Sequence, residues 1–303
     1  MTAGRKLNNK ATEQRKKPAV ERFNRLLSSC SLGCLQRIGR GIGRLAALGN
    51  NRLSRTTADN LLLAFPEQDS RWRRRLYHAS LQHTGCALTE TALLWHRPME
   101  AVLSVADSSG VCAAFDTDPR PRIVIAPHLG NWEFLNLWLS QRLPLMSLYK
   151  PARNPQIDRY IRLGRTRSGA ELLPVGTAGL RAMLRGLSEG KSCLILPDQR
   201  PGKGSSPVLS RFFGQTVDSS PLVSRLAART DCSLYLATAI RRAETPGFKI
   251  IIRSMDRLAL NTDVQSATEY LDQRIEALVR EYPEQYQWAY KRFRPEAYAQ
   301  LSE

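Results

Sequence analysis

Residues 122–133 read RIVIAPHLGNWE, a short apolar run followed by a polar segment that contains one glycine. The run 122–127 predicts a buried strand, because it is short, rich in β-branched residues and followed by turn-forming residues. Asn131 is a good helix cap, and we expect a helix over 131–141. A strand that passes through a turn into a helix is the repeating unit of an α/β fold.

The same alternation of strand and helix signals continues toward the C-terminus. Strands are expected over 145–149, 172–175, 192–196, 233–240 and 248–253, and helices over 154–167, 177–189, 220–229 and 267–281. The last two strands follow each other closely enough to pair antiparallel. We therefore predict an α/β fold with a mixed, mostly parallel sheet flanked by helices. In such sheets the functional groups gather beyond the carboxyl ends of the strands.

His128 and Glu133 are the candidate catalytic residues at such a strand end. If residues 129–130 form a turn, Glu133 in the first helical turn can fold back onto His128. A carboxylate on one imidazole nitrogen fixes the tautomer and leaves the other nitrogen as a base near neutral pH. There is no G-x-S-x-G elbow and no cysteine close to His128, so direct activation of a substrate hydroxyl is favoured over a covalent nucleophile. From the local pattern alone, a purely structural histidine remains an open alternative.

The first fifty residues differ in composition from the rest of the chain. Residues 1–19 are polar and basic, which predicts a disordered arm. Over 20–50, apolar residues and arginines recur with helical spacing on different faces, which predicts an amphipathic helix on a membrane surface. A helix packed against the protein is the alternative, and the longest uncharged run, 26–36, is too short to span a bilayer. Residues 51–303 are expected to form one catalytic domain.

The charge balance is strongly basic, with 45 Lys and Arg against 27 Asp and Glu and a net charge of +18. Such a field attracts polyanions, which include anionic lipid, acidic carrier proteins and nucleic acid. The cluster RWRRR at 71–75 suits nucleic acid, but no zinc-finger, helix-turn-helix or RNA-binding pattern accompanies it, so no nucleic-acid partner is expected. Six scattered cysteines without C-x-x-C or H-E-x-x-H spacing indicate reduced cytosolic thiols and no metal site.

Seven short motifs lie in order along the chain. They are N-L-x-x-x-F-P-E at 60–67, H-x-x-x-x-E at 128–133, Y-K-P-x-x-N-P-x-x-D at 149–158, G-R-T-R-S at 164–168, P-D-Q at 197–199, F-F-G at 212–214 and P-E-Q-Y-x-W-x-x-x-R-F at 283–293. This set resembles the motifs of the bacterial lipid A late acyltransferases, the lauroyl and myristoyl transferases that are related to the glycerol-phosphate acyltransferase superfamily. Each motif is weak alone, but the ordered set is specific and extends over most of the chain.

The resemblance implies an O-acyltransferase of lipopolysaccharide biosynthesis at the cytoplasmic face of the bacterial inner membrane, bound there as a peripheral or monotopic protein. The donor it implies is an acyl carrier protein thioester, the acceptor is a hydroxyl of a lipid A precursor, and no cofactor or metal is implied. It also implies His128 as a general base paired with Glu133, without a covalent intermediate. Substrate-binding roles are implied for Asn131, Asn154, Arg165, Arg167 and Asp198.

Three departures from the family pattern bear on these expectations. Arginines interrupt the N-terminal apolar segment, which favours peripheral attachment. Lys150 stands where the family usually has arginine, and Arg200-Pro201 follows the P-D-Q motif, and both of these bear on acceptor binding. The acceptor therefore has an alternative in the hydroxyl of another lipid, such as a lysophospholipid or another glycolipid. A non-catalytic lipid-binding protein is disfavoured, because binding alone would not require both His128 and Glu133.

Overall fold

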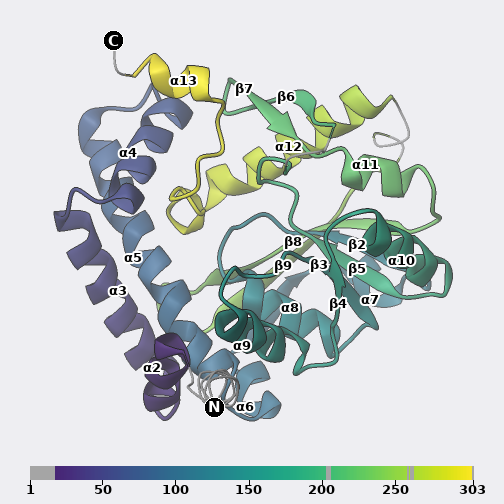
Figure 1. The fold of residues 1–303 in the computed structure, drawn as a ribbon, viewed down its shortest axis with the longest axis horizontal. Coiled ribbons are helices and arrows are strands. Elements are labelled where there is room, and N and C mark those ends of the chain that lie inside the picture. The colour runs from purple at the N-terminus through teal and green to yellow at the C-terminus, as the bar shows by residue number, and fades with distance from the viewer. Residues whose placement is uncertain (1–17, 203–205, 258, 260–262, 302–303) are drawn as a thin grey trace, which may run out of the picture.

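A seven-stranded sheet forms the centre of the computed structural model, which describes residues 18–202, 206–257, 259 and 263–301 (Figure 1). The strands lie in the order β1-β9-β8-β2-β5-β3-β4. Their bounds are β1 Ala106–Val111, β2 Arg122–Ile125, β3 Leu145–Tyr149, β4 Glu171–Pro174, β5 Ser192–Ile195, β8 Ser233–Arg241 and β9 Phe248–Ser254. Neighbouring strands are parallel except for β8 with β9. The predicted mixed, mostly parallel sheet is confirmed, and so is the antiparallel final pair.

Helices cover both faces of this sheet. They are α2 Ala19–Leu27, α3 Leu32–Leu48, α4 Arg52–Ala64, α5 Ser70–Leu94, α6 Met99–Leu103, α7 Ala113–Thr117, α8 Trp132–Ser140, α9 Pro155–Thr166, α10 Thr177–Ser188, α11 Leu222–Ala227, α12 Val264–Glu281 and α13 Pro295–Ala299, with a 3₁₀ turn at Pro283–Gln285. Ile123 and Ile125 of β2 point into one core with α10, α11 and α12, whereas Val124 points into the other with α8. Because β2 is buried on both faces, the run RIVIAP does not alternate between apolar and polar residues.

Two structural features in the middle of the chain carried no clear strand signal. Strand β1 reads ADSSGV, and it pairs as an edge strand with β9. Strands β6 (Val208–Phe212) and β7 (Gln215–Ser219) form a separate antiparallel hairpin. Its turn has positive φ at both Phe213 and Gly214, as a two-residue hairpin turn requires. The F-F-G motif therefore marks this turn.

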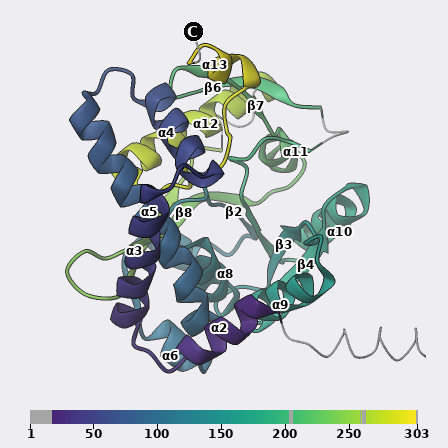
Figure 2. The ribbon, with the colours of Figure 1, turned by 60° about the vertical axis from the view of Figure 1, so that its left-hand side comes forward.

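The predicted single helix over 20–50 is instead two helices, α2 and α3, and Ser31 caps the second of them. Figure 2 shows α3 lying along α5, whereas α2 lies across the end of α5 and points toward α9. The contact of α3 with α5 is close because it is made by glycines: a Cβ added at Gly85 would lie 2.0 Å from the Gly39 carbonyl oxygen, and one at Gly43 would lie 2.2 Å from the Leu81 oxygen. The segment thus packs on the protein, and most of the predicted basic arm, residues 1–17, falls outside the described residues.

The far end of α3 nevertheless presents apolar side chains to solvent. Leu45 is 71% exposed and Leu48 is 82% exposed, and Leu62 on α4 is also exposed. None of the helices in the described residues is long and apolar enough to span a membrane.

Candidate active site

The site is built where two adjacent strands end. Strands β2 and β5 are parallel neighbours with Ile125 opposite Ile195, so residues three positions beyond each strand lie side by side. These residues are His128 and Asp198, and their side chains are 2.7 Å apart between Nδ1 and Oδ1. The backbone N–H of His128 donates to the second Asp198 oxygen at 2.8 Å. Asp198 therefore holds His128 by both its ring and its backbone.

The Asp198 carboxyl is buried, with a side chain that is 1% exposed. Burial alone would raise its pKa, but attraction to His128 and two hydrogen bonds from His128 outweigh this effect, and the pKa of Asp198 lies below its ordinary value. An ionised Asp198 accepts a hydrogen bond from the Nδ1–H of His128, which leaves Nε2 as a hydrogen-bond acceptor. The amide nitrogen of Gln199 lies 3.1 Å from Nε2 and 3.3 Å from the Gln287 side-chain oxygen, so this amide can donate to both.

The turn after His128 depends on Gly130. Its φ is +66°, and a Cβ at this position would lie 2.2 Å from the Ala239 carbonyl oxygen. The predicted turn at 129–130 is therefore present, and Asn131 caps α8 by accepting from the Phe134 N–H at 2.8 Å. The turn and cap direct the first turn of α8 toward α9.

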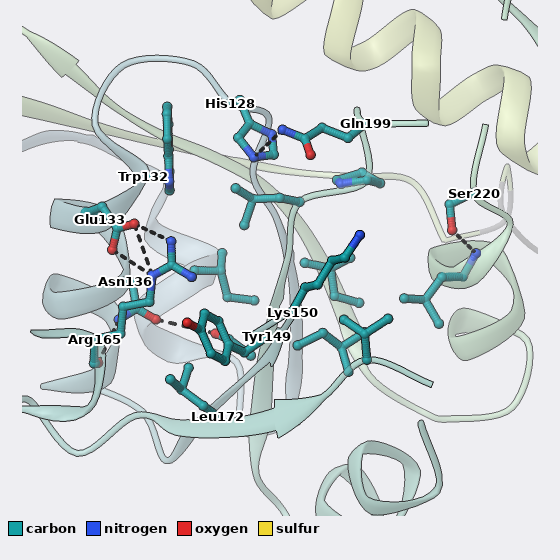
Figure 3. A pocket seen from close by; sticks show the side chains of 18 of the residues that line it. His128, Trp132, Glu133, Asn136, Tyr149, Lys150, Arg165, Leu172, Gln199 and Ser220 are labelled. Atoms are coloured by element: carbon teal, nitrogen blue, oxygen red, sulfur yellow. Dashed lines mark hydrogen bonds and ion pairs between the residues drawn. The ribbon is translucent and has the colours of Figure 1, made fainter. Parts of the chain in front are cut away.

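As a result, Glu133 faces Arg165 and does not face His128 (Figure 3). The Nε of Arg165 donates to both Glu133 carboxylate oxygens at 3.0 Å, and Nη2 donates to one of them as well. Among the described residues, the carboxylate that contacts the imidazole is that of Asp198. The predicted contact between Glu133 and His128 is therefore not formed, because helix α8 carries Glu133 to the opposite wall.

His128, Glu133 and Arg165 line one cavity of about 370 Å³, while Asp198 is buried behind His128. In Figure 3, His128 and Gln199 lie together at one side of the cavity, while Glu133 and Arg165 meet across from them. The edge of Trp132 packs on the His128 ring with centroids 4.9 Å apart. Much of the remaining wall is apolar, and its members include Leu148, Leu172, Val175, Leu194, Leu196 and Leu222.

Arg165 is partly buried within this wall. Burial lowers the pKa of its guanidinium, but the Glu133 charge and hydrogen bonds raise it by more, so the net pKa of Arg165 lies above its ordinary value. Its guanidinium also lies over the Tyr149 ring, 5.5 Å from the centroid. Its Nη1 makes no hydrogen bond to any described residue. A fixed cation thus faces the same cavity as the imidazole.

Three other predicted site residues do not line this cavity and have structural partners. Asn131 donates to Glu90 at 2.7 Å, and Glu90 forms a buried ion pair with Arg241 at 2.8 Å. Asn154 caps α9 by accepting from two backbone N–H groups. Arg167 donates to carbonyl oxygens at the end of α5. These contacts hold α8, α9 and α5 in place around the site.

Gln287 was missed by sequence reasoning, and no local signal could have found it. A bridge between Leu129 and Tyr286 brings the C-terminal segment beside the turn, and the Gln287 N–H donates to the His128 carbonyl oxygen at 2.9 Å. The contact of Asp198 with His128 did have a signal, since 192–196 was predicted as a strand with Asp198 just beyond it. No group of three or more His, Cys, Asp or Glu side chains within the described residues is arranged to hold a metal ion.

A carboxylate-held imidazole thus lies at the edge of an α/β sheet, beside a largely apolar cavity that also contains a partly buried arginine, and such an imidazole can act as a general base toward a hydroxyl. The chain belongs to the bacterial lipid A biosynthesis acyltransferase family, whose model matches residues 23–295. It is accordingly an O-acyltransferase of lipid A biosynthesis.

Relatives with this activity in their names cover most of the chain. A lipid A biosynthesis palmitoleoyltransferase of Escherichia coli (strain K12) is 27% identical over 264 residues, which span 85% of this chain and 84% of the relative. The lauroyltransferase of the same organism is 26% identical over 269 residues, with 86% of each chain covered. A myristoyltransferase is 25% identical over 263 residues, which span 85% of this chain and 79% of the relative. The three names differ in the acyl group transferred.

Proposed function

We propose that this enzyme transfers a fatty acyl group from an acyl carrier protein thioester to a hydroxyl of a lipid A precursor, in lipopolysaccharide biosynthesis. The observation that carries the proposal is the His128 imidazole, held at Nδ1 by buried Asp198 while Nε2 faces the apolar cavity. Family membership supports the acceptor class. The enzyme would act at the cytoplasmic face of the bacterial inner membrane as a peripheral or monotopic protein.

The reaction begins when the acceptor hydroxyl replaces the Gln199 amide at Nε2 of His128. Nε2 takes the hydroxyl proton as the oxygen attacks the thioester carbonyl carbon. The tetrahedral intermediate collapses with cleavage of the C–S bond, and the imidazolium returns the proton to the leaving thiolate. Asp198 stabilises the imidazolium throughout. This is the role that was predicted for Glu133.

Glu133 and Arg165 act on the other reacting atom. The carbonyl oxygen becomes negative in the intermediate, and a preorganised cation or N–H donor lowers the energy of that state. The unused Nη1 of Arg165 faces the cavity side of the pair, and Glu133 keeps the guanidinium in position. Glu133 is therefore required through Arg165, although it does not touch His128.

A covalent acyl-enzyme is not needed for this mechanism. Two serines line the described cavity wall, but Ser147 donates to Asn136 and Ser220 accepts from the Leu222 N–H. Neither serine is hydrogen-bonded to His128, which a serine nucleophile would require. The acyl chain would lie against the leucine-rich wall, whose depth then limits chain length.

The test is acyl transfer in detergent from a panel of acyl carrier protein thioesters to a tetra-acylated lipid A precursor. His128→Ala and Asp198→Asn should each lower kcat by about 10²-fold or more, because each removes the oriented base. Glu133→Gln should lower kcat to a similar degree, because the oxyanion donor loses its support. Asp116→Asn, an exposed carboxyl on α7, is the matched control and should retain the wild-type rate.

The outcomes separate the parts of the proposal. A folded Asp198→Asn enzyme with the wild-type rate would remove Asp198 from the mechanism, and the same result for His128→Ala would remove the base. Wild-type protein that acylates no lipid A precursor would eliminate this acceptor. Other hydroxylated lipids, including lysophospholipids, would then be tried with the same thioesters.

A further inference from the structure

A second cavity, of about 360 Å³, lies beside the active site and is lined by cations. It lies between the first turn of α4 and the C-terminal segment 289–291. Arg52, Arg200 and Lys291 line it together with Thr56 and Tyr290, and no carboxyl side chain is among the described residues that form its wall. The predicted site residues did not include any of these side chains.

The positive charges in this cavity are poorly compensated. Neither Arg52 nor Lys291 has an ion pair within the described residues, and Lys291 lies only over the Tyr298 ring at 4.8 Å. Arg200 pairs with Asp218 at 2.9 Å, and the same carboxylate also contacts Arg294 at 3.6 Å. Like charges that converge without a matching anion are unfavourable unless a ligand supplies one.

Hydrogen-bond donors are available as well as charge. The Tyr290 hydroxyl accepts from the Arg200 backbone N–H at 3.0 Å, so its own hydrogen is available for a ligand, and no acceptor for it occurs in the described residues. Arginine offers two parallel N–H groups to a phosphate, and such contacts are short and strong. The cavity thus offers the chemistry of a phosphate monoester site.

Arg200 connects this cavity to the active site. Its side chain lines both cavities, and it directly follows Gln199, whose amide contacts Nε2 of His128. One molecule can therefore place a hydroxyl at His128 and an anionic group beyond Arg200. Arg52 also lies only four residues after exposed Leu48, so an exposed apolar helix end precedes this cavity along the chain.

We propose that the cavity of Arg52, Arg200 and Lys291 binds a phosphate monoester of the lipid acceptor and so positions its hydroxyl at His128. This inference rests on the proposed function. A phosphate could also come from the prosthetic arm of the carrier protein. The acceptor is the assigned source, because Arg52 lies only four residues after the exposed Leu48 and Arg200 also lines the active-site cavity.

The test pairs a variant with a chemical change in the acceptor. Arg52→Gln/Lys291→Gln should raise KM for a phosphorylated lipid A precursor roughly tenfold or more, because two charge-assisted contacts are lost. With the same precursor after enzymatic dephosphorylation, wild type and variant should have similar KM values, both high. Arg181→Gln/Arg185→Gln removes the same charge from exposed positions on α10 and should follow wild type with both acceptors.

A direct binding measurement separates this inference from the acceptor assignment. Wild-type protein titrated with glucosamine 1-phosphate should bind it, the Arg52→Gln/Lys291→Gln variant should bind at least about tenfold more weakly, and glucosamine should bind neither. If the wild type transfers no acyl group to lipid A precursors, the proposed function fails while this titration still decides the phosphate site. Equal binding of glucosamine 1-phosphate by variant and wild type would overturn the site.

The source of the phosphate is decided by changing the donor. Replacing the carrier thioester by an acyl N-acetylcysteamine thioester removes the prosthetic-arm phosphate but leaves the acceptor unchanged. The KM difference between variant and wild type should persist with this donor. If the KM difference between variant and wild type disappears with this donor, the phosphate does not come from the acceptor. The same conclusion follows if the KM difference is equal for phosphorylated and dephosphorylated acceptors.

Discussion

At the scale of single residues, two histidines show how environment sets chemistry. His128 has a carboxylate on one ring nitrogen, and its ring lines the active-site cavity. His83 on α5 has no such carboxylate: it is largely buried, and its Nδ1 has no hydrogen-bond partner. Burial, followed by the charges of Arg241 and Arg40, lowers the pKa of His83 to about 3.

His83 should therefore make the fold acid-sensitive. The unfolded chain takes up a proton at the ordinary histidine pKa near 6.5, whereas the folded protein does not until about pH 3. Stability is thus full above pH 6.5 and falls as the pH drops below it, by up to about 2 kcal/mol at pH 5.

His83→Phe should flatten this part of the pH profile, and chemical denaturation at pH 7 and pH 5 measures it. The difference in unfolding free energy between the two pH values should be smaller in the variant than in wild type. Identical differences in the two proteins would mean that His83 does not titrate as the structure indicates.

At the scale of elements, the contact of α3 with α5 determines how the N-terminal helices sit. Backbone meets backbone there, because Gly39 and Gly43 of α3 oppose Gly85 and Cys86 of α5. No side chain fits between the two helices at these positions. The same α5 carries Glu90, whose buried pair with Arg241 holds Asn131 at the start of α8. The helix pair is thereby connected to the active-site turn.

Gly85→Ala should destabilise the protein by about 1–3 kcal/mol or more, since its Cβ would lie 2.0 Å from the backbone oxygen of Gly39 and the helices must separate. Gly41→Ala on α3 is the matched control. A Cβ there meets nothing within 4 Å, so the alanine should be neutral or stabilise by up to about 1 kcal/mol. Thermal unfolding of both variants measures the contrast, and equal midpoints would refute the close packing.

At the scale of the whole molecule, charge and exposed apolar side chains act together. The net charge of +18 attracts an anionic membrane surface from a distance. We propose that the enzyme binds such a surface and that Leu45 and Leu48 at the end of α3 make apolar contact with it.

Co-sedimentation with vesicles that contain anionic phospholipid tests this attachment. Leu45→Gln/Leu48→Gln should weaken binding about 30-fold or more, because each buried leucine contributes on the order of 1 kcal/mol or more. Leu163→Gln/Leu209→Gln removes two exposed leucines from α9 and β6 and serves as control. High salt should weaken binding by all three proteins, since it screens the charge term. Equal loss in the two double variants would place the attachment elsewhere.

The local sequence by itself determined the main elements of the core and the position of the base. RIVIAP, LMSLY and SCLIL are short apolar runs bounded by turns, and Asn131 and Asn154 cap helices through their nearest neighbours. Such signals are local, so they can be recognised without the fold. The position of His128 beyond a strand end follows from the same pattern, because parallel strands align their carboxyl ends.

Only the tertiary structure decided which groups meet. Asp198 lies beside His128 because β5 is the neighbour of β2 in the sheet. The order of the strands cannot be predicted from the sequence of either strand alone. Glu133 contacts Arg165 because the position at which α8 begins determines the direction in which each of its side chains points. The cavity of Arg52, Arg200 and Lys291 joins three distant segments. Contacts between distant segments depend on the packing of whole elements, and for that reason they lie beyond the reach of local pattern.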